Sequence, residues 1–167
     1  MGRLEPSVRE NPRDAGETPT EALRYDLRPH PEGGWFRRTW TSPDQLRLVD
    51  PDGGERVRPA ATLIQFCLPP RECSAWHRVA SEEIWIWNGA GRIRLQLGGS
   101  GERPSGGQVL VLGPDAAAGE VLQARVPAGV WQCTLASDTT GLASCLVSPG
   151  FDFADFTLAE TPADGPG

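Results

Sequence analysis

Lysine is missing from this sequence of 167 residues, so its 16 basic side chains other than histidine are all arginines. A chain without lysine forms no lysine Schiff base and has no lysine-containing phosphate-binding loop. Biased codon usage in a GC-rich genome accounts for the absence most simply, and we expect a bacterial protein.

Long hydrophobic runs and basic stripes are missing as well. No segment approaches the length of a membrane span, and the polar residues 1–19 lack the apolar core of a secretory signal. The net charge of -6 argues against nucleic acid as a partner, because binding to phosphates depends on clustered cations. We therefore expect a soluble, cytoplasmic protein with neither a membrane nor a nucleic acid as its partner.

The four cysteines, Cys67, Cys73, Cys133 and Cys145, include no Cys-x-x-Cys pair. In a cytoplasmic protein we expect them to be reduced and mostly to fill the core. The alternative is a disulfide between Cys133 and Cys145, which requires these two to face each other across a hairpin.

The composition predicts one globular domain at 20–160, preceded by a disordered leader at 1–19 and followed by a flexible tail at 161–167. A short helix is predicted after Pro19. Thr18 is its expected N-cap and Glu21 completes a capping box, while Pro29 ends it.

Nearly all of the remaining signal is β, because short runs of apolar and branched residues alternate with glycine and proline turns. This pattern predicts an all-β sandwich or barrel. Residues 42–59 are polar, with a Pro-Asp-Gly-Gly turn at 51–54, and the phenylalanine-rich residues 149–158 are expected to fold back as an apolar clasp. The predicted strands are 35–41, 61–68, 82–87, 92–97, 108–112, 120–126, 130–135 and 142–148.

The most informative segment is 74–89, which holds His77, two adjacent glutamates and three tryptophans. Alternation along a strand places Glu83, Trp85 and Trp87 on one face. Large rings beside a carboxylate suit a small-molecule pocket, where burial raises the pKa of a carboxyl that has no cationic partner. The alternative is that the tryptophans are ordinary core and that Glu83 lies at the surface or in an ion pair.

Two further segments carry polar groups among aromatic ones. In HPEGGWFRRT at 30–39, Arg37 shares a strand face with Trp35 and is suited to bind an anion, unless this is an edge strand with solvent-facing arginines. In VPAGVWQ at 126–132, Gln132 either binds a ligand or satisfies the backbone.

These segments, with SAWHRVASEEIWIWNGAG at 74–91 and PGFDFADFTLA at 149–159, resemble a small cupin-like subfamily in order and spacing. The resemblance implies a cupin jelly-roll β-barrel with a short N-terminal helix, and a homodimer. It also implies a pocket whose polar residues correspond to His77 and Glu83. The same barrel carries dTDP-sugar 3,5-epimerases, and many members of the subfamily have no assigned reaction.

Metal-dependent cupins use two histidines and a glutamate in a first motif and a further histidine in a second. Set against that pattern, this sequence has Ala75 and Gln132 where histidines are expected, and Ile86 stands where many members of the subfamily place another histidine. The residues that remain, His77, Glu83 and Gln132, form a poor ligand set for a divalent metal. We therefore expect no cofactor, with a divalent metal on these three residues as the alternative.

The predicted function is metal-independent proton transfer on an anionic or carbonyl-bearing metabolite, in specialised metabolism. The reaction is an epimerisation, an isomerisation or a dehydration with cyclisation, in which His77 is the acid or base and Glu83 orients it or acts as the second such group. One alternative is a ligand-binding cupin without catalysis, and another is a metal-dependent oxygenase or decarboxylase. The expected substrate-binding residues are Arg37, Gln65, Trp76, Trp85, Trp87, Trp131 and Gln132.

Overall fold

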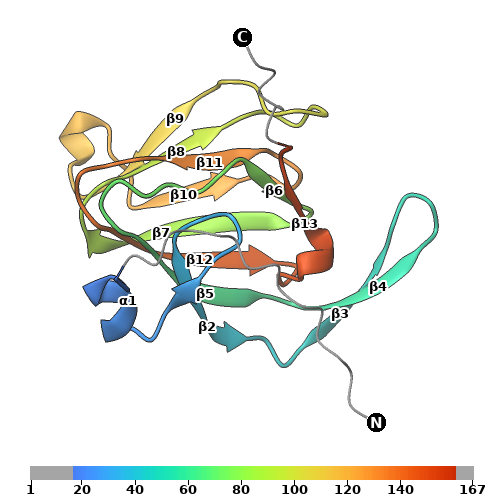
Figure 1. Cartoon of the computed structure of the whole chain (residues 1–167). Helices are drawn as coiled ribbons and strands as arrows, with labels where there is room; N and C mark the ends of the chain where they lie inside the picture. Colours follow the sequence, from blue (N-terminus) through green and yellow to red (C-terminus); the bar gives the residue numbers. More distant parts are fainter. Residues whose placement is uncertain (1–16, 161–167) are drawn as a thin grey trace, which may run out of the picture.

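A computed structural model describes residues 17–160, which form two β-sheets around a common core (Figure 1). The all-β prediction is confirmed. The predicted tail and all but residues 17–19 of the predicted leader lie outside the described residues, so both stay predictions. None of the helices within the described range is long and apolar enough to cross a membrane.

Six strands form the larger sheet in the spatial order β1-β2-β5-β12-β7-β10, and five form the smaller one in the order β13-β6-β11-β8-β9. The larger sheet consists of β1 (Arg28–Pro29), β2 (Trp35–Thr41), β5 (Thr62–Leu68), β7 (Glu82–Ala90), β10 (Gln123–Val126) and β12 (Gly141–Ser148). The smaller sheet consists of β6 (His77–Val79), β8 (Ile93–Leu97), β9 (Val109–Leu112), β11 (Gln132–Leu135) and β13 (Phe156–Leu158).

The core lies between the two sheets and takes side chains from both. Phe66 and Trp85 of the larger sheet pack with Ile93, Leu95 and Leu112 of the smaller one, and all five are buried. Each strand contributes alternate residues to this core, which is the pleat that the sequence alternation predicts. Every predicted strand is present with small shifts at its ends.

A second cluster covers the outer face of the larger sheet. Ala22 and Leu27, in and after the helix α1 (Thr20–Arg24), pack against Cys67, with Trp35 beside them. The predicted capping box is wrong, because Pro19 in extended backbone is the N-cap and no side chain caps the helix.

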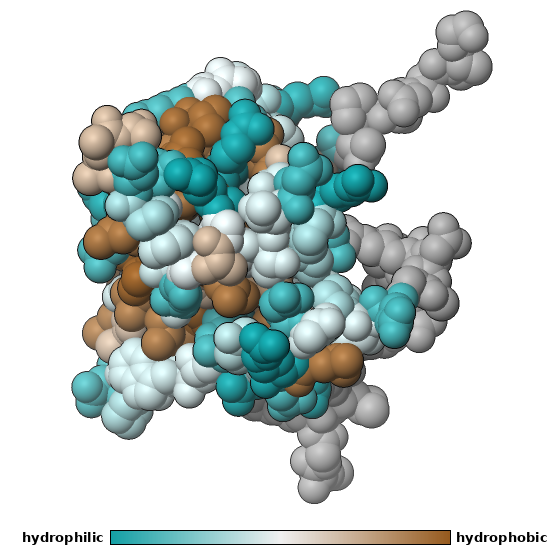
Figure 2. Space-filling model, turned by 90° about the vertical axis from the view of Figure 1, so that its left-hand side faces the viewer, coloured by the Kyte–Doolittle hydropathy of each residue, from teal (hydrophilic) through white to brown (hydrophobic). Residues whose placement is uncertain are grey.

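A hairpin of β3 (Gln45–Val49) and β4 (Glu55–Pro59) projects from the barrel (Figure 1). The Pro-Asp-Gly-Gly turn is confirmed, since Gly53 N–H donates to the Asp50 carbonyl. The strands on either side of it were not predicted, because residues 42–59 are mostly polar, although Leu46 and Leu48 alternate with Gln45 and Arg47. At the opposite end of the barrel, which carries α1, patches of apolar side chains lie between hydrophilic ones (Figure 2).

The C-terminal residues fold back over the barrel, as predicted. We call residues 149–158 the clasp; it contains the 3-10 helix η2 (Phe153–Asp155), and its strand β13 pairs antiparallel with β6. A second 3-10 helix, η1 (Ala116–Ala118), follows β9.

All four cysteines are free thiols, and only Cys73 is exposed. The alternative disulfide between Cys133 and Cys145 is wrong. Its two residues lie on β11 and β12, which belong to different sheets and do not form a hairpin.

Candidate functional site

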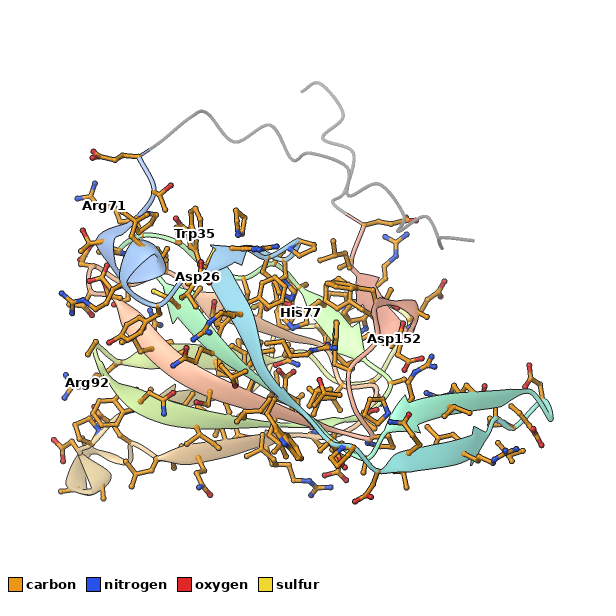
Figure 3. The ribbon with its side chains drawn as sticks, turned by 90° about the horizontal axis from the view of Figure 1, so that it is seen from below. Asp26, Trp35, Arg71, His77, Arg92 and Asp152 are labelled. Carbon is orange, nitrogen blue, oxygen red and sulfur yellow. The ribbon has the colours of Figure 1, made fainter. Side chains whose placement is uncertain are left out.

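A small cavity of about 30 Å³ lies inside the barrel beneath the clasp. That volume is on the order of a single water molecule. Two histidines and two glutamates line it, His30, His77, Glu32 and Glu83, together with other residues that include Arg38, Cys145, Phe36, Phe66 and Phe151. Figure 3 shows His77 in the interior, on the side of the barrel that carries Asp152 and the clasp, whereas Arg92 lies at the far end.

His77 is held at both ring nitrogens. Its Nδ1 lies 2.8 Å from the carbonyl oxygen of Ala75, which only accepts, so Nδ1 carries the hydrogen. Its Nε2 lies 3.0 Å from Oε2 of Glu32, and Phe156 of the clasp stacks on the ring. The imidazole of His77 and the carboxyl of Glu32 therefore share one proton.

Burial decides which partner holds that proton. Burial lowers the pKa of His77 to about 4 and raises the pKa of Glu32 well above its ordinary value, with the nearby Glu83 raising it further. Both shifts favour uncharged groups. At neutral pH, Glu32 is a carboxylic acid that donates to Nε2 of a neutral His77.

Glu83 is held by a chain of side chains from two strands, β7 and β11. The indole Nε1 of Trp85 donates to Oε1 of Gln132 over 2.9 Å, and Gln132 Nε2 donates to Oε2 of Glu83 over 2.5 Å. Because an indole N–H only donates, Trp85 fixes which way the amide of Gln132 faces. Burial raises the pKa of Glu83 to about 7, and the hydrogen bonds from Gln132 and Cys145 limit the rise.

Sequence reasoning missed Glu32 and His30 as parts of this site. The backbone N–H of Glu32 donates to Nδ1 of His30, so the hydrogen of the neutral ring is on Nε2. Burial, helped by the nearby His77, lowers the pKa of His30 to about 3. The available signal was the His-Pro-Glu-Gly-Gly sequence itself, which places an imidazole and a carboxyl in one tight turn.

Arg37 does not reach the cavity. It lies on the outer face of β2, where its Nη2 donates to Oε1 of Gln65 over 3.3 Å, so the two predicted substrate-binding residues bind each other at the surface. The predicted alternation was right but the inward face was misassigned. Trp35 packs under α1, whereas Phe36 and Arg38 face the cavity.

The four tryptophans predicted as walls are absent from the lining of the cavity. Trp85 is buried core, and the indole N–H of Trp87 donates to the Gly91 carbonyl. Trp131 donates to the Gly101 carbonyl, and Trp76 packs beside Gly98. Phenylalanines line the cavity instead, because those of β2, β5 and the clasp point into it.

The alternative metal set of His77, Glu83 and Gln132 does not fit the arrangement of these side chains. Nε2 of His77 faces the Glu32 carboxyl, and the only oxygen of the Gln132 side chain accepts from Trp85. Among residues 17–160, no group of three or more histidine, cysteine, aspartate or glutamate side chains is placed to hold a metal ion.

A family model described as "Cupin superfamily (DUF985)" matches residues 22–159. A hypothetical protein from Leishmania major is 29% identical with a TM-score of 0.69, over 81% of this chain and 83% of that one. A Shewanella oneidensis protein is 30% identical with a TM-score of 0.69, over 83% and 81%.

Some more distant structures have the same fold. A dTDP sugar isomerase from Desulfovibrio desulfuricans is 19% identical with a TM-score of 0.51, over 77% of this chain and 85% of that one. No curated protein sequence matches. These likenesses confirm the cupin barrel that the motifs predicted.

Proposed function

The chain belongs to the cupin superfamily, in the family designated DUF985, and on that premise we propose that it is an enzyme that moves protons on a small metabolite. The observation that carries the proposal is that a proton donor and a proton acceptor line the same cavity. Glu32 and His77 hold an available proton, while Glu83, with a pKa of about 7, is ready to accept one. A base whose pKa lies near the working pH is the most effective one.

In the proposed reaction, ionised Glu83 removes a proton from the carbon beside a carbonyl group. The electron pair of that C–H bond forms a carbon–carbon double bond, and the carbonyl oxygen takes the proton of Glu32 to give an enol. When a proton returns from Glu83 to carbon and an enol O–H gives its proton back to Glu32, the isomerisation or epimerisation is complete. Where a hydroxyl group lies one carbon further on, Glu32 protonates it instead and it leaves as water.

His77 acts on Glu32 in this scheme. Its unprotonated Nε2 accepts the hydrogen bond of the Glu32 carboxyl, which fixes the direction of the acidic proton while the site is empty. When Glu32 gives its proton to the substrate, the carboxylate regains one from the enol in an isomerisation. After a dehydration it regains one from solvent, to which Glu83 releases the proton that it removed. The pair therefore serves as the acid and Glu83 as the base.

A substrate must displace part of the clasp, because a cavity of about 30 Å³ does not hold a metabolite. Phe151 lines the cavity and Phe156 stacks on His77, so these clasp residues are the ones that move. Enclosure by apolar rings after binding would exclude water and keep the carboxyl pKa values high.

Hydrogen exchange in deuterated water tests the proposal without knowledge of the product. A panel of small carbonyl compounds and hydroxy acids is incubated with the protein, and loss of the carbon-bound proton is followed by NMR. We expect Glu83→Gln and Glu32→Gln to slow the exchange by roughly a hundredfold or more. Glu82→Gln is the matched control, because Glu82 is the exposed neighbour that pairs with Arg125.

Wild-type exchange rates in the Glu83→Gln variant would contradict the proposal. Tight binding of a compound that neither exchanges nor reacts would instead support the non-catalytic binding module. Stimulation of an oxygenase or decarboxylase reaction by added iron, manganese or zinc would support the metal-dependent alternative.

The homodimer and the cytoplasmic location also stay proposals. A groove of about 500 Å³ on the outer face of the larger sheet, lined by Ile84, Leu146 and Pro149, offers an apolar surface for a second copy. Light scattering coupled to gel filtration measures the mass, and we expect Leu146→Glu to convert a dimer into monomer. A monomeric wild-type protein would contradict the assignment.

A further inference from the structure

The geometry points to a second part of the same site: a subsite at Arg38 for an oxyanion, either a carboxylate or a phosphate group of the substrate. It deepens the proposed function and rests on it for the claim that a substrate reacts there. The anion-binding step itself is independent of any reaction.

Arg38 reaches the cavity because of where it stands on β2. Its side chain shares the inward face with Phe36, and both residues line the cavity. Directly after it the pairing with β5 shifts, since Arg38 lies opposite Ile64 but Trp40 lies opposite Leu63, which leaves Thr39 as an extra residue. Bulges of this kind re-aim side chains and are common beside active sites.

The guanidinium of Arg38 has N–H donors that form no hydrogen bond with the described residues. Its Nη2 donates to the carbonyl oxygen of Phe151 over 3.2 Å, and its Cζ lies 5.9 Å from the centre of the Phe151 ring. A guanidinium carries five N–H donors. Within the described part of the chain, no carboxylate oxygen lies within 4 Å of its nitrogens, whereas Arg58 forms two hydrogen bonds with Asp155.

The acidic groups around Arg38 leave its charge largely uncompensated. Inside the cavity Glu32 is protonated and Glu83 is half ionised near neutral pH, while both histidines are neutral. Outside it, Asp152 exerts a favourable charge interaction but uses Oδ1 to accept from the Ala154 N–H in the first turn of η2. Burial lowers the pKa of Arg38, as expected for a partly desolvated cation without a carboxylate partner.

An arginine with free, parallel N–H donors recognises planar carboxylates and phosphates through two hydrogen bonds. At Arg38 such a group would lie where the clasp meets the barrel, with the rest of the molecule directed inward to Glu83 and Glu32. The substrate class that follows is a small acid or phosphorylated compound whose reacting carbon is close to its anionic end.

Binding of two simple probes, acetate and inorganic phosphate, tests the subsite. The Nε–H signal of Arg38 in ¹⁵N-correlated NMR spectra is followed during titration of each probe. We expect saturable shifts with at least one probe, and affinity weakened by roughly tenfold or more in Arg38→Gln. Arg38→Lys keeps the positive charge but lacks the two parallel N–H donors. It should therefore bind the probes more weakly than the wild type and more strongly than Arg38→Gln.

Arg37→Gln is the matched control, because Arg37 is the preceding residue of the same strand and faces away from the cavity. Its affinity for the probes should equal that of the wild type. Binding of acetate alone assigns a carboxylate, and binding of phosphate alone assigns a phosphate. No saturable shift with either probe, or equal weakening in both glutamine variants, would overturn the subsite.

The two proposals fail separately. Anion binding is measured without turnover, and Glu83→Gln should bind the probes while losing hydrogen exchange. If Arg38→Gln still catalyses hydrogen exchange and binds every substrate with wild-type affinity, the subsite is contradicted but the acid–base pair is not. If the probes bind at Arg38 but no compound undergoes exchange, the proposed enzymatic activity is contradicted and the protein is an anion-binding module.

Discussion

The carboxyl of Glu32 and the imidazole of His77 meet 3.0 Å apart although they come from different elements of the barrel. Glu32 lies in the turn between β1 and β2, and His77 begins β6. The backbone ties the two segments together, since Ala75 N–H donates to the Glu32 carbonyl over 2.6 Å. One proton on this pair keeps it uncharged, which is what a buried setting favours.

We predict that the two histidines are opposite tautomers at neutral pH. His77 should carry its hydrogen on Nδ1, which faces the Ala75 carbonyl, and His30 on Nε2, because its Nδ1 accepts from the Glu32 N–H. The ¹⁵N chemical shifts of the ring nitrogens distinguish the two forms. The His77 ring should become an imidazolium only as the pH approaches about 4. An imidazolium at position 77 near neutral pH would mean that Glu32 is ionised.

The sequence predicts the strands well because most of them face one core. Ile93 and Leu95 alternate with Arg92 and Arg94, and both apolar residues are buried. In the hairpin β3–β4, Leu46 and Leu48 also alternate with polar residues, but this strand is mostly exposed. Its short alternation among charged residues and turn residues was interpreted as a loop.

The site was predictable only in part. Alternation correctly placed Glu83 on the face of Trp85, but alternation gives two faces without saying which one points inward. On β2 both faces carry an aromatic residue, and only the position of α1 over Trp35 decides that Arg38 faces the cavity. The contact of Glu32 with His77 depends on the folding of distant segments, which no local pattern contains.

Replacement of Glu83 by glutamine should stabilise the protein at alkaline pH. The pKa of Glu83 is about 7 in the folded protein against an ordinary value of 4.5, so ionisation of the buried group costs roughly 3 kcal/mol well above pH 7. The cost disappears as the pH falls from 7 towards 4.5, because the folded state then binds the proton. Glutamine carries no charge at any pH and keeps an oxygen for Gln132 to donate to.

Urea denaturation across a pH series measures this effect. The difference in unfolding free energy between Glu83→Gln and the wild type should favour the variant near pH 9 and shrink towards about pH 5. Glu82→Gln is the control, since the ion pair with Arg125 lowers the pKa of Glu82 and removes any reason for an alkaline gain. A difference that does not change with pH would show that Glu83 is not buried as a weak acid.

Asp155 should control how tightly the clasp covers the site. Its carboxylate accepts from Nε and Nη2 of Arg58 at 2.7 Å and 2.9 Å, and it also lies 3.2 Å from Arg56. The pairing lowers the pKa of Asp155, and two hydrogen bonds to one guanidinium are stronger than an ordinary surface pair. Asp155→Asn should therefore raise hydrogen exchange at clasp amides by roughly tenfold.

The amide of Ala80 reports this loosening directly, because it donates to the Asp155 carbonyl over 3.1 Å. Asp138→Asn is the matched control, since Asp138 and Arg71 are 3.9 Å apart with side chains 94% and 88% exposed. Such an exposed pair contributes little. Unchanged exchange at Ala80 in Asp155→Asn would show that aromatic packing alone holds the clasp.

Gly34 should be essential to the turn that presents Glu32. Its φ of +71° is a conformation that side-chain-bearing residues rarely adopt, and its carbonyl accepts from the His30 N–H over 2.9 Å. A Cβ atom there would lie 2.7 Å from Cζ of Phe66 and 2.9 Å from the carbonyl oxygen of Cys67. Gly34→Ala must therefore move the turn or the core.

Gly53→Ala separates the cost of the backbone conformation from the cost of overpacking, because Gly53 has a φ of +86° but nothing within 4 Å of the position of a Cβ. We expect about 1 kcal/mol of destabilisation in Gly53→Ala from the backbone conformation alone, and a further 1–3 kcal/mol or so in Gly34→Ala from overpacking. Only Gly34→Ala should also shift the ring signals of His77, since it moves Glu32. Equal stability of the two variants would mean that the turn yields freely and does not hold Glu32 against His77.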